Sequence, residues 1–480
     1  MIDTLDPARG VVIGGRYRRG GAGLFEVEDP ATGRVVASVA DGDAADAADA
    51  VTAAATAFDG WRAWAPRRRS ETLQLAHALM LRDADALAAT ISRENGKSRA
   101  DAHSEVTYAA EFFRWFAEEA VRTGGDYGPA PGGGARTLVT SRPVGVAALV
   151  TPWNFPAAMV TRKLAPALAA GCTAVLKPAA ETPLTALALV RLLAEAGVPD
   201  GVVNVVPTTD PEAVVGTWLR DPRVRKVSFT GSTRVGRHLL RQAADRVVNT
   251  SMELGGNAPF VVTAGADLDA AVDGAMVAKF RGGGQACTAA NRFYVHADVV
   301  DDFTARLGER VEALTVGPAD TGADIGPLIS SAAVDRITSL IHGAVRQGAR
   351  VAHRATVPAA KGWFLAPTVL ADVPADAAIL TEEIFGPVAP IVAWHHEADL
   401  LRQVNATEMG LAAYVYAADA GHALRLAEQI EAGMVGVNRG VVSDPAAPFG
   451  GTKQSGVGRE GARAGLDAFL ETQYFSVDWP

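Results

Sequence analysis

Cys287 is one of two cysteines among the 480 residues of the chain, and it comes shortly after three consecutive glycines, Gly282 to Gly284. Glycine-rich backbone bends tightly and lets a ligand approach closely. A thiol on such a loop suits a nucleophile, which reacts as the thiolate. The motif alone leaves an inert buried cysteine equally open, since that is the common fate of a free cysteine. The other cysteine, Cys172, precedes an apolar run and is interpreted as structural.

Two other side chains could assist a thiol. Asn154 lies between two prolines after an apolar strand pattern, where its amide could donate to developing negative charge. Turn geometry explains this asparagine as well, and better when the motif is taken alone. Glu253 ends another strand pattern, where burial would raise its pKa towards that of a useful general base. A structural ion pair accounts for Glu253 equally well.

A phosphate-binding turn is indicated at Gly231 and Ser232, which stand between a strand pattern and a helical pattern. Free N–H groups and the helix dipole attract anions at such a place. The segment matches neither the GxGxxG nor the Walker pattern, so a helix start without a ligand is the simpler interpretation. Lys177, at the end of another strand pattern, is a second candidate. The sequence has no HExxH, CxxC or clustered histidines, so no metal site is expected.

The elements that carry these residues follow from a change of pattern along the chain. The first 120 residues are alanine-rich, and they have helical spacing over 45–58, 71–95 and 102–122. After a glycine-rich segment, apolar runs alternate with helical stretches, which predicts βαβ units and a doubly wound parallel sheet. The runs cover residues 146–151, 173–177, 202–206, 226–230 and 250–254. A similar alternation begins again near residue 261, and the tail at 469–479 could pair with residues 137–140.

Length and composition exclude several classes of protein. A chain of 480 residues is too long for one core and predicts two or three domains. A formal charge of −9 argues against a nucleic-acid partner. The uncharged run between Arg142 and Arg162 holds three prolines, so no membrane span is expected. Two cysteines and an acidic N-terminus without an apolar core favour a cytoplasmic protein with no signal peptide.

Taken together and in order, these segments resemble the aldehyde dehydrogenase superfamily over nearly the whole chain. The matching segments are TPWNFP at 151–156, LKPAAETP at 176–183, FTGSTRVG at 229–236, MELGGNAPF at 252–260, GQACT at 284–288, EEIFGP at 382–387 and PFGGTKQSGVGREG at 448–461. The resemblance implies three units, assembled as a homodimer or homotetramer. They are a Rossmann-like α/β cofactor domain (1–122 and 144–253), an α/β catalytic domain (254–460) and a small β oligomerisation flap (123–143 and 461–480).

The resemblance also implies roles for individual residues. Cys287 matches the nucleophile and Glu253 the general base, while Asn154 and the Cys287 main-chain N–H match the oxyanion donors. The residues that match cofactor contacts are Trp153, Lys177, Gly231, Ser232, Glu383 and Phe385. The implied reaction oxidises an aldehyde with NAD or NADP through a thioester on Cys287, which water activated by Glu253 then hydrolyses.

Within the superfamily the chain is most similar to succinate-semialdehyde dehydrogenases. The residues that match the binding site for the distal carboxylate are Arg162, Arg281 and Ser443. A guanidinium pairs with a carboxylate through two parallel hydrogen bonds, which supports this role. Structural ion pairs are the alternative role for these arginines. Glutarate semialdehyde or another ω-carboxyl aldehyde is the alternative substrate, because an arginine constrains charge more than chain length.

Two departures from the family pattern carry predictions. Ala180 stands where many NAD-preferring relatives have a glutamate, which would bind a ribose 2′-hydroxyl and repel a 2′-phosphate. The chain is therefore expected to accept NADP, and the neighbouring Glu181 leaves the preference between NADP and NAD open. Ala289 stands where some relatives have a second cysteine, so no disulfide switch at Cys287 is expected.

Overall fold

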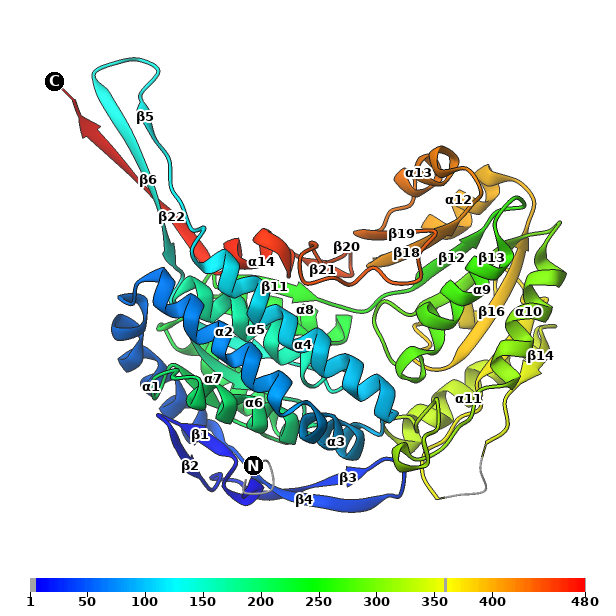
Figure 1. The fold of residues 1–480 in the computed structure, drawn as a ribbon, viewed down its shortest axis with the longest axis horizontal. Helices are drawn as coiled ribbons and strands as arrows, with labels where there is room; N and C mark the ends of the chain where they lie inside the picture. The colour runs from blue at the N-terminus through cyan, green and yellow to red at the C-terminus, as the bar shows by residue number, and fades with distance from the viewer. Residues whose placement is uncertain (1–5, 358–360, 480) are drawn as a thin grey trace.

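The computed structural model describes residues 6–357 and 361–479. Within these residues, two large sheets flanked by helices stand side by side, and a narrow sheet of β5, β6 and β22 projects away from them (Figure 1). The α/β fold class that the sequence predicts is confirmed. The predicted cofactor domain starts, and the predicted flap ends, at residues 1–5 and 480, which lie outside the described residues.

The first sheet has the spatial order β2-β1-β9-β8-β7-β10-β11-β21. From β9 to β11 neighbouring strands run parallel, as the alternation of strands and helices predicts. Its strands are β1 (Val11–Ile13), β2 (Arg16–Arg18), β7 (Val146–Val150), β8 (Thr173–Lys177), β9 (Val203–Val205), β10 (Val224–Thr230), β11 (Asn249–Glu253) and β21 (Gly456–Val457). Because parallel strands end at one edge, the residues that follow β7, β8, β10 and β11 meet there.

Helices pack on both faces of this sheet, and α5 is buried along its whole length because it contacts α4 as well as β7 and β8. The helices are α1 (Ala44–Arg62), α2 (Pro66–Arg82), α3 (Ala84–Asn95), α4 (Arg99–Ala120), α5 (Ala158–Ala170), α6 (Pro183–Glu195), α7 (Pro211–Arg220), α8 (Thr233–Ala244) and α14 (Ala462–Asp467). The helix predicted over 71–95 is interrupted at Asp83, whose φ of −100° and ψ of 18° are not helical. No helix of the described residues is long and apolar enough to cross a bilayer.

The N-terminal region contains strands, whereas the sequence prediction describes the first 120 residues as largely helical in period. Besides β1 and β2, it contains the hairpin of β3 (Gly23–Asp29) and β4 (Arg34–Asp41). Strands of three residues are too short to give a period. In β3 the residues Phe25 and Val27 alternate with the exposed Glu26 and Glu28, so this strand carries a period-two signal that the sequence prediction did not use.

The second sheet has the order β14-β15-β16-β13-β12-β18-β19, and only β14 runs antiparallel to its neighbour within this part of the described chain. Its strands are β12 (Ala258–Val262), β13 (Ala290–His296), β14 (Arg350–Arg354), β15 (Thr368–Ala371), β16 (Val388–Trp394), β18 (Ala412–Tyr416) and β19 (Met434–Val437). Its helices are α9 (Leu268–Ala275), α10 (Val300–Glu312), α11 (Ser331–Arg346), α12 (Glu397–Asn405) and α13 (Ala420–Glu428). The pair β17 (Met409–Gly410) and β20 (Thr452–Lys453) lies apart from both sheets.

The projecting sheet joins β5 (Tyr127–Pro129), β6 (Ala135–Pro143) and the C-terminal β22 (Leu470–Asp478). Pairing of the tail with residues 137–140 is thus confirmed, and Figure 1 shows the C-terminus near the tip of this sheet. The strand β21 lies within residues predicted for the catalytic domain, but it pairs with β11 of the first sheet. The domain boundaries themselves stay a prediction.

Candidate active site

A cavity of about 330 Å³ brings together most of the residues that the sequence singles out. The predicted residues that line it are Trp153, Asn154, Arg162, Gly231, Ser232, Arg281, Cys287, Glu383, Phe385 and Ser443. Among the described residues, Glu253, Lys177 and Ala180 belong to the predicted set but do not line this cavity. The predicted residues among the lining come from connections after β7, β10 and β19 and from the loops before β13 and β16, so only the tertiary fold collects them.

The loop that carries Cys287 owes its path to its glycines. The helix α9 continues as a π-helical turn over Met276–Phe280, and then Gly282, Gly283 and Gly284 have φ of 60°, 64° and 72°. A Cβ atom on Gly284 would stand 2.4 Å from the main-chain oxygen of Gly386. Left-handed backbone and this close approach both require glycine, so the tight bend that the sequence predicts is present.

The Cys287 side chain is only half-buried, because it opens onto the cavity, yet protein atoms surround it closely. This burial raises the pKa of the Cys287 thiol to about 12, although the Arg162 guanidinium acts in the opposite direction. At neutral pH the thiol therefore holds its proton, and attack on a carbonyl carbon requires that this proton is removed.

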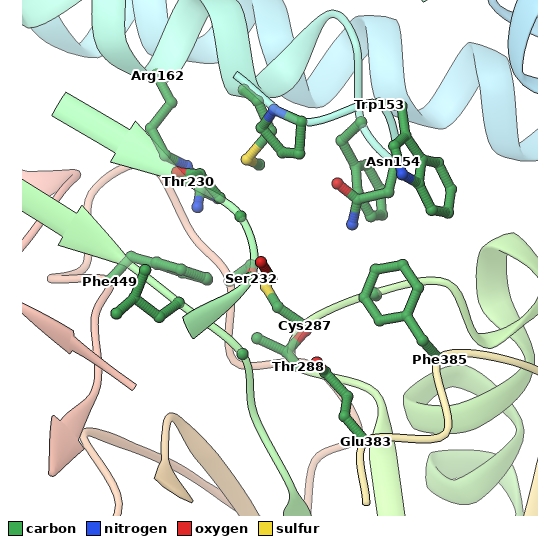
Figure 2. A pocket seen from close by; sticks show the side chains of 18 of the residues that line it. Trp153, Asn154, Arg162, Thr230, Ser232, Cys287, Thr288, Glu383, Phe385 and Phe449 are labelled. Atoms are coloured by element: carbon green, nitrogen blue, oxygen red, sulfur yellow. The ribbon is translucent and has the colours of Figure 1, made fainter. Parts of the chain in front are cut away.

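Asn154 is buried beside the cysteine loop. Its Nδ2 atom donates a hydrogen bond to the main-chain oxygen of Gln285 at 3.0 Å. A side-chain amide has two N–H groups, so the second one is free to donate to an oxygen in the cavity. Figure 2 shows the amide on the side of the cavity that faces Cys287. The geometry suits a pair of donors made of this amide and the Cys287 main-chain N–H.

Glu253 ends β11 and is 2% exposed. Neither oxygen of its carboxyl group has a hydrogen-bond partner among the described residues. Burial raises the pKa of the Glu253 carboxyl group well above its usual value, the nearby Glu460 adds to this rise, and Lys163 and Arg162 oppose it. Burying a carboxyl group without a partner costs folding free energy, so a structural ion pair does not account for this glutamate. General base catalysis uses a proton acceptor with a raised pKa, and Glu253 fits that description.

Two arginines face the cavity with donors to spare. Arg162 is 2% exposed and donates to the Tyr108 hydroxyl, and its guanidinium carbon lies 3.9 Å from the ring centre of Phe449. Its Nε and Nη1 atoms have no hydrogen-bond partner in the described part of the chain, but Nη1 lies 4.0 Å from Glu460 Oε2, so part of the structural ion-pair alternative for Arg162 is present. Burial opposes the charged form of Arg162, but Tyr108 and Glu460 outweigh burial, so the pKa is raised. Arg162 therefore stays cationic.

Arg281 is half-buried at the same cavity. Within the described residues its guanidinium forms no hydrogen bond or ion pair, and its central carbon lies 5.9 Å from the ring centre of Phe155. The Ser443 side chain lines the cavity as well. Because both arginines keep unused donors, this side of the cavity suits an anionic group on a ligand.

The remaining lining fits a dinucleotide. Ser232 accepts a hydrogen bond from the Val235 N–H at 3.4 Å and so caps α8, whose first turn faces this edge of the sheet. The Trp153 and Phe385 rings meet edge to face at 5.5 Å between their centres (Figure 2). A Cβ atom on Gly231 would stand 2.5 Å from the Phe229 ring, so a larger residue would disturb this turn.

Charged groups near this lining have shifted pKa values. Burial raises the pKa of Glu383 to about 7, and the Gly256 N–H, which donates to its Oε1 at 3.1 Å, opposes the rise. Lys177 ends β8, where burial lowers its pKa and Glu181 opposes the change. Ala180 is half-buried in the turn after β8. A buried lysine and a helix start at the ends of parallel strands match the phosphates of a dinucleotide.

Sequence reasoning missed several residues that the fold brings to the site. Tyr108 lies on α4 and holds Arg162, and nothing in the helical pattern around it marks a contact 54 residues away. Arg336 of α11 donates to the main-chain oxygens of Glu383 and Ile384 at 3.0 and 2.6 Å. No group of three His, Cys, Asp or Glu side chains in the described ranges is arranged to hold a metal ion.

Comparison with known proteins gives one family. The model of the aldehyde dehydrogenase family matches residues 17–475. The chain is 51% identical to a succinate-semialdehyde dehydrogenase of Paenarthrobacter nicotinovorans, over 88% of this chain and 94% of that protein. It is 47% identical to the succinate-semialdehyde dehydrogenase of Escherichia coli K12, whose name includes NADP(+), over 94% of each chain. It is 46% identical to a glutarate-semialdehyde dehydrogenase of Pseudomonas aeruginosa, again over 94% of each.

Among solved structures, the succinate-semialdehyde dehydrogenase from Burkholderia pseudomallei superposes with a TM-score of 0.96 at 46% sequence identity, covering 98% of both chains. Agreement of this extent includes the two large sheets and the projecting sheet together. The fold that surrounds the cavity is therefore the same in this relative.

Proposed function

Because the chain belongs to the aldehyde dehydrogenase family, we propose that it oxidises succinate semialdehyde to succinate with NADP+ or NAD+. One observation carries the choice of substrate: the cavity that holds Cys287 also holds Arg162, whose Nε and Nη1 make no hydrogen bond, and Arg281, whose guanidinium makes none among the described residues. A substrate with an aldehyde at one end and a carboxylate at the other satisfies both sides of the cavity.

Cys287 is the nucleophile of the proposed reaction. Its sulfur bonds to the aldehyde carbon as the thiol proton passes to solvent water, and the carbonyl oxygen takes negative charge. Asn154 Nδ2 and the Cys287 main-chain N–H donate to this oxygen. Such donors act where charge develops, and losing one of them typically costs about 10²- to 10³-fold in rate.

The tetrahedral carbon can then release its hydrogen with the bonding electron pair. A bound nicotinamide dinucleotide would supply the acceptor for this hydride, and a thioester would then remain on Cys287. The groups proposed to hold the dinucleotide are Trp153, Lys177, Gly231, Ser232, Glu383 and Phe385. Their task is to orient it against the carbon bound to Cys287.

Glu253 is proposed to complete the cycle. It takes a proton from water, the resulting hydroxide attacks the thioester carbon, and the acid leaves while the sulfur of Cys287 recovers its proton. The carboxyl group is suited to this exchange because no hydrogen-bond partner among the described residues holds it in one place. A hydrolytic base also disfavours transfer of the acyl group to coenzyme A, since water would consume the thioester.

NADP+ is proposed as an accepted cofactor. Ala180 carries no charge that would repel a 2′-phosphate, and the Escherichia coli relative is named with NADP(+). Glu181 is exposed nearby, so the preference between the two dinucleotides is left to measurement.

Assembly as a homodimer or homotetramer is proposed to use the projecting sheet. Tyr127 and Tyr474 on this sheet and Trp479 just after it are 63%, 60% and 51% exposed, and large apolar side chains in water favour association. The cytoplasm is the proposed location, because Cys172 and Cys287 are both free thiols.

A substrate panel tests the proposed function. We expect kcat/KM for succinate semialdehyde to exceed that for butanal, which has the same number of carbons but no carboxylate, with NADP+ and with NAD+ measured in parallel. Glutarate semialdehyde and pentanal form the second matched pair, since a relative is named for glutarate semialdehyde. Equal values within each pair would refute a site for an ω-carboxylate. A higher kcat/KM for glutarate semialdehyde than for succinate semialdehyde would support the ω-carboxylate site and make the five-carbon aldehyde the preferred substrate.

A further inference from the structure

One face of α4 contacts three separate segments of the candidate active site. Asp101, Glu105 and Tyr108 stand at i, i+4 and i+7 of this helix, so their side chains lie above one another. Tyr108 accepts a hydrogen bond from Arg162, as described above. The other two contacts concern the main chain that carries Asn154 and Cys287.

Lys97 and Glu105 form a buried ion pair behind Asn154. Their side chains are 4% and 0% exposed, and Lys97 Nζ lies 2.5 Å from Glu105 Oε2. The same Nζ atom donates to the main-chain oxygen of Asn154 at 2.8 Å and stands 3.9 Å from the ring centre of Phe155. The lysine therefore binds the backbone of the residue whose side chain faces the cavity.

The second oxygen of Glu105 binds the other end of the same segment. Glu105 Oε1 accepts hydrogen bonds from the N–H groups of Ala157 and Ala158 at 2.8 and 3.3 Å. These residues open α5, whose N-cap residue, Ala157, has no side chain that can cap the helix. Glu105 thus supplies the missing cap. Residues 154–158 are held at both ends by one pair of charges.

Asp101 ties the cysteine loop to the same helix. Its Oδ2 accepts a hydrogen bond from the Gly282 N–H at 2.8 Å, at the first of the three glycines that lead to Cys287. The two donors that must converge on one substrate oxygen come from loops 133 residues apart in sequence, and both loops are anchored to α4 within four residues. A shared rigid support keeps such donors in register.

Stability alone does not explain the Lys97–Glu105 pair. Taking two charges out of water costs free energy that their attraction often only offsets, so well-packed apolar residues would stabilise a fold equally well. What apolar residues cannot do is hold a main-chain oxygen on one side and two main-chain N–H groups on the other. The pair makes these three bonds to the segment that begins with Asn154 and to no other segment of the described chain.

We propose that Lys97 and Glu105 are positioning residues, which set the Asn154 amide against the oxygen that develops negative charge, while Asp101 keeps the Cys287 loop in register with it. The proposal rests on the proposed oxidation of an aldehyde at Cys287. Lys97 and Glu105 do not line the catalytic cavity, but they line a neighbouring cavity of about 160 Å³ together with Arg281 and Ser443. In the proposal they act through Asn154 and not on the substrate, so the tests below use a neutral aldehyde as well as a carboxylated one.

A double-mutant cycle on the first turnover tests this role. The rate of the NADPH burst, which reports the steps up to the thioester, is measured for the unmodified enzyme, Lys97→Met, Asn154→Ala and the double variant. Loss of an oxyanion donor costs about 10²- to 10³-fold, so a misplaced one is expected to slow the burst at least about tenfold in Lys97→Met, with KM changed less than about twofold. In the Asn154→Ala background the same substitution should change the burst by less than about twofold. Equal losses in both backgrounds would overturn the proposal.

Controls separate positioning from folding. Arg69→Met removes another buried cation, which donates to the Ala169 oxygen at 3.0 Å near the C-terminal end of α5. It is expected to lower the unfolding midpoint and keep the burst rate. If Lys97→Met does not fold, Glu105→Gln, which keeps an acceptor for the Ala157 N–H, takes its place in the cycle under the same criterion. Succinate semialdehyde and butanal are both tried, and the faster one is used, so the outcome does not depend on substrate preference.

Discussion

Replacing Arg281 with alanine is expected to lower kcat/KM for succinate semialdehyde by about 10- to 160-fold and that for butanal by less than about twofold. The reason lies in the contacts of this side chain. Within the described residues its guanidinium has no hydrogen bond or ion pair, so alanine removes little that holds the protein together. The loss falls on the substrate carboxylate instead.

The size of the effect follows from the type of bond. A hydrogen bond to a charged group contributes about 1.5–3 kcal/mol net. At about 1.36 kcal/mol for each tenfold change in rate, this corresponds to the stated range. Arg162 stays in the cavity and keeps its charge, so the variant retains attraction for an anion and does not lose discrimination entirely.

The assay follows NADPH formation at 340 nm with both aldehydes, beside a thermal unfolding scan. Arg281→Lys keeps the charge and loses the planar fork, so its kcat/KM for succinate semialdehyde is expected to lie between those of the unmodified enzyme and Arg281→Ala. Arg336→Ala is the matched control, because this arginine lines the same cavity but donates to main-chain oxygens, and it should affect both aldehydes alike. An equal loss for succinate semialdehyde and butanal in Arg281→Ala would show that the arginine is structural.

Three further predictions concern protons and the cofactor. Because burial raises the pKa of Glu253, thioester hydrolysis should speed up as pH rises through the raised value. Protein stability should fall as pH rises from the ordinary glutamate pKa to the raised one, since only the folded state holds the proton there, and should then level off. Glu253→Gln should remove the Glu253 contribution to both pH dependences and accumulate acyl-enzyme visible by mass spectrometry. Alkylation of Cys287 by iodoacetamide should still accelerate near pH 10, because the thiol pKa is about 12, and a plateau near pH 8.5 would contradict this. Ala180→Glu should lower kcat/KM for NADP+ by at least about tenfold and spare NAD+, and an unmodified enzyme with a strong NAD+ preference would refute the premise.

Local patterns in the chain were enough to predict the sheet and the cysteine loop. The strands β7, β8, β10 and β11 are short apolar runs between helical stretches, and parallel pairing follows from that alternation. The three glycines before Cys287 allow a left-handed path that no other residue adopts easily. Both features depend on residues that are close together in the sequence, so they can be predicted from the sequence.

Charge environments were decided by the tertiary structure alone. Nothing around Glu253 in the sequence distinguishes an unpaired carboxyl from an ion pair, since its environment comes from Glu460, Lys163 and Arg162, which lie elsewhere in the chain. The same holds for Lys97 and Glu105, whose bonds to the Asn154 segment span more than 50 residues. Electrostatic interactions depend on distance in space and on the exclusion of water, and neither is encoded in local spacing. Residue types therefore indicate which chemistry is available, and packing determines which groups are charged, held or free to react.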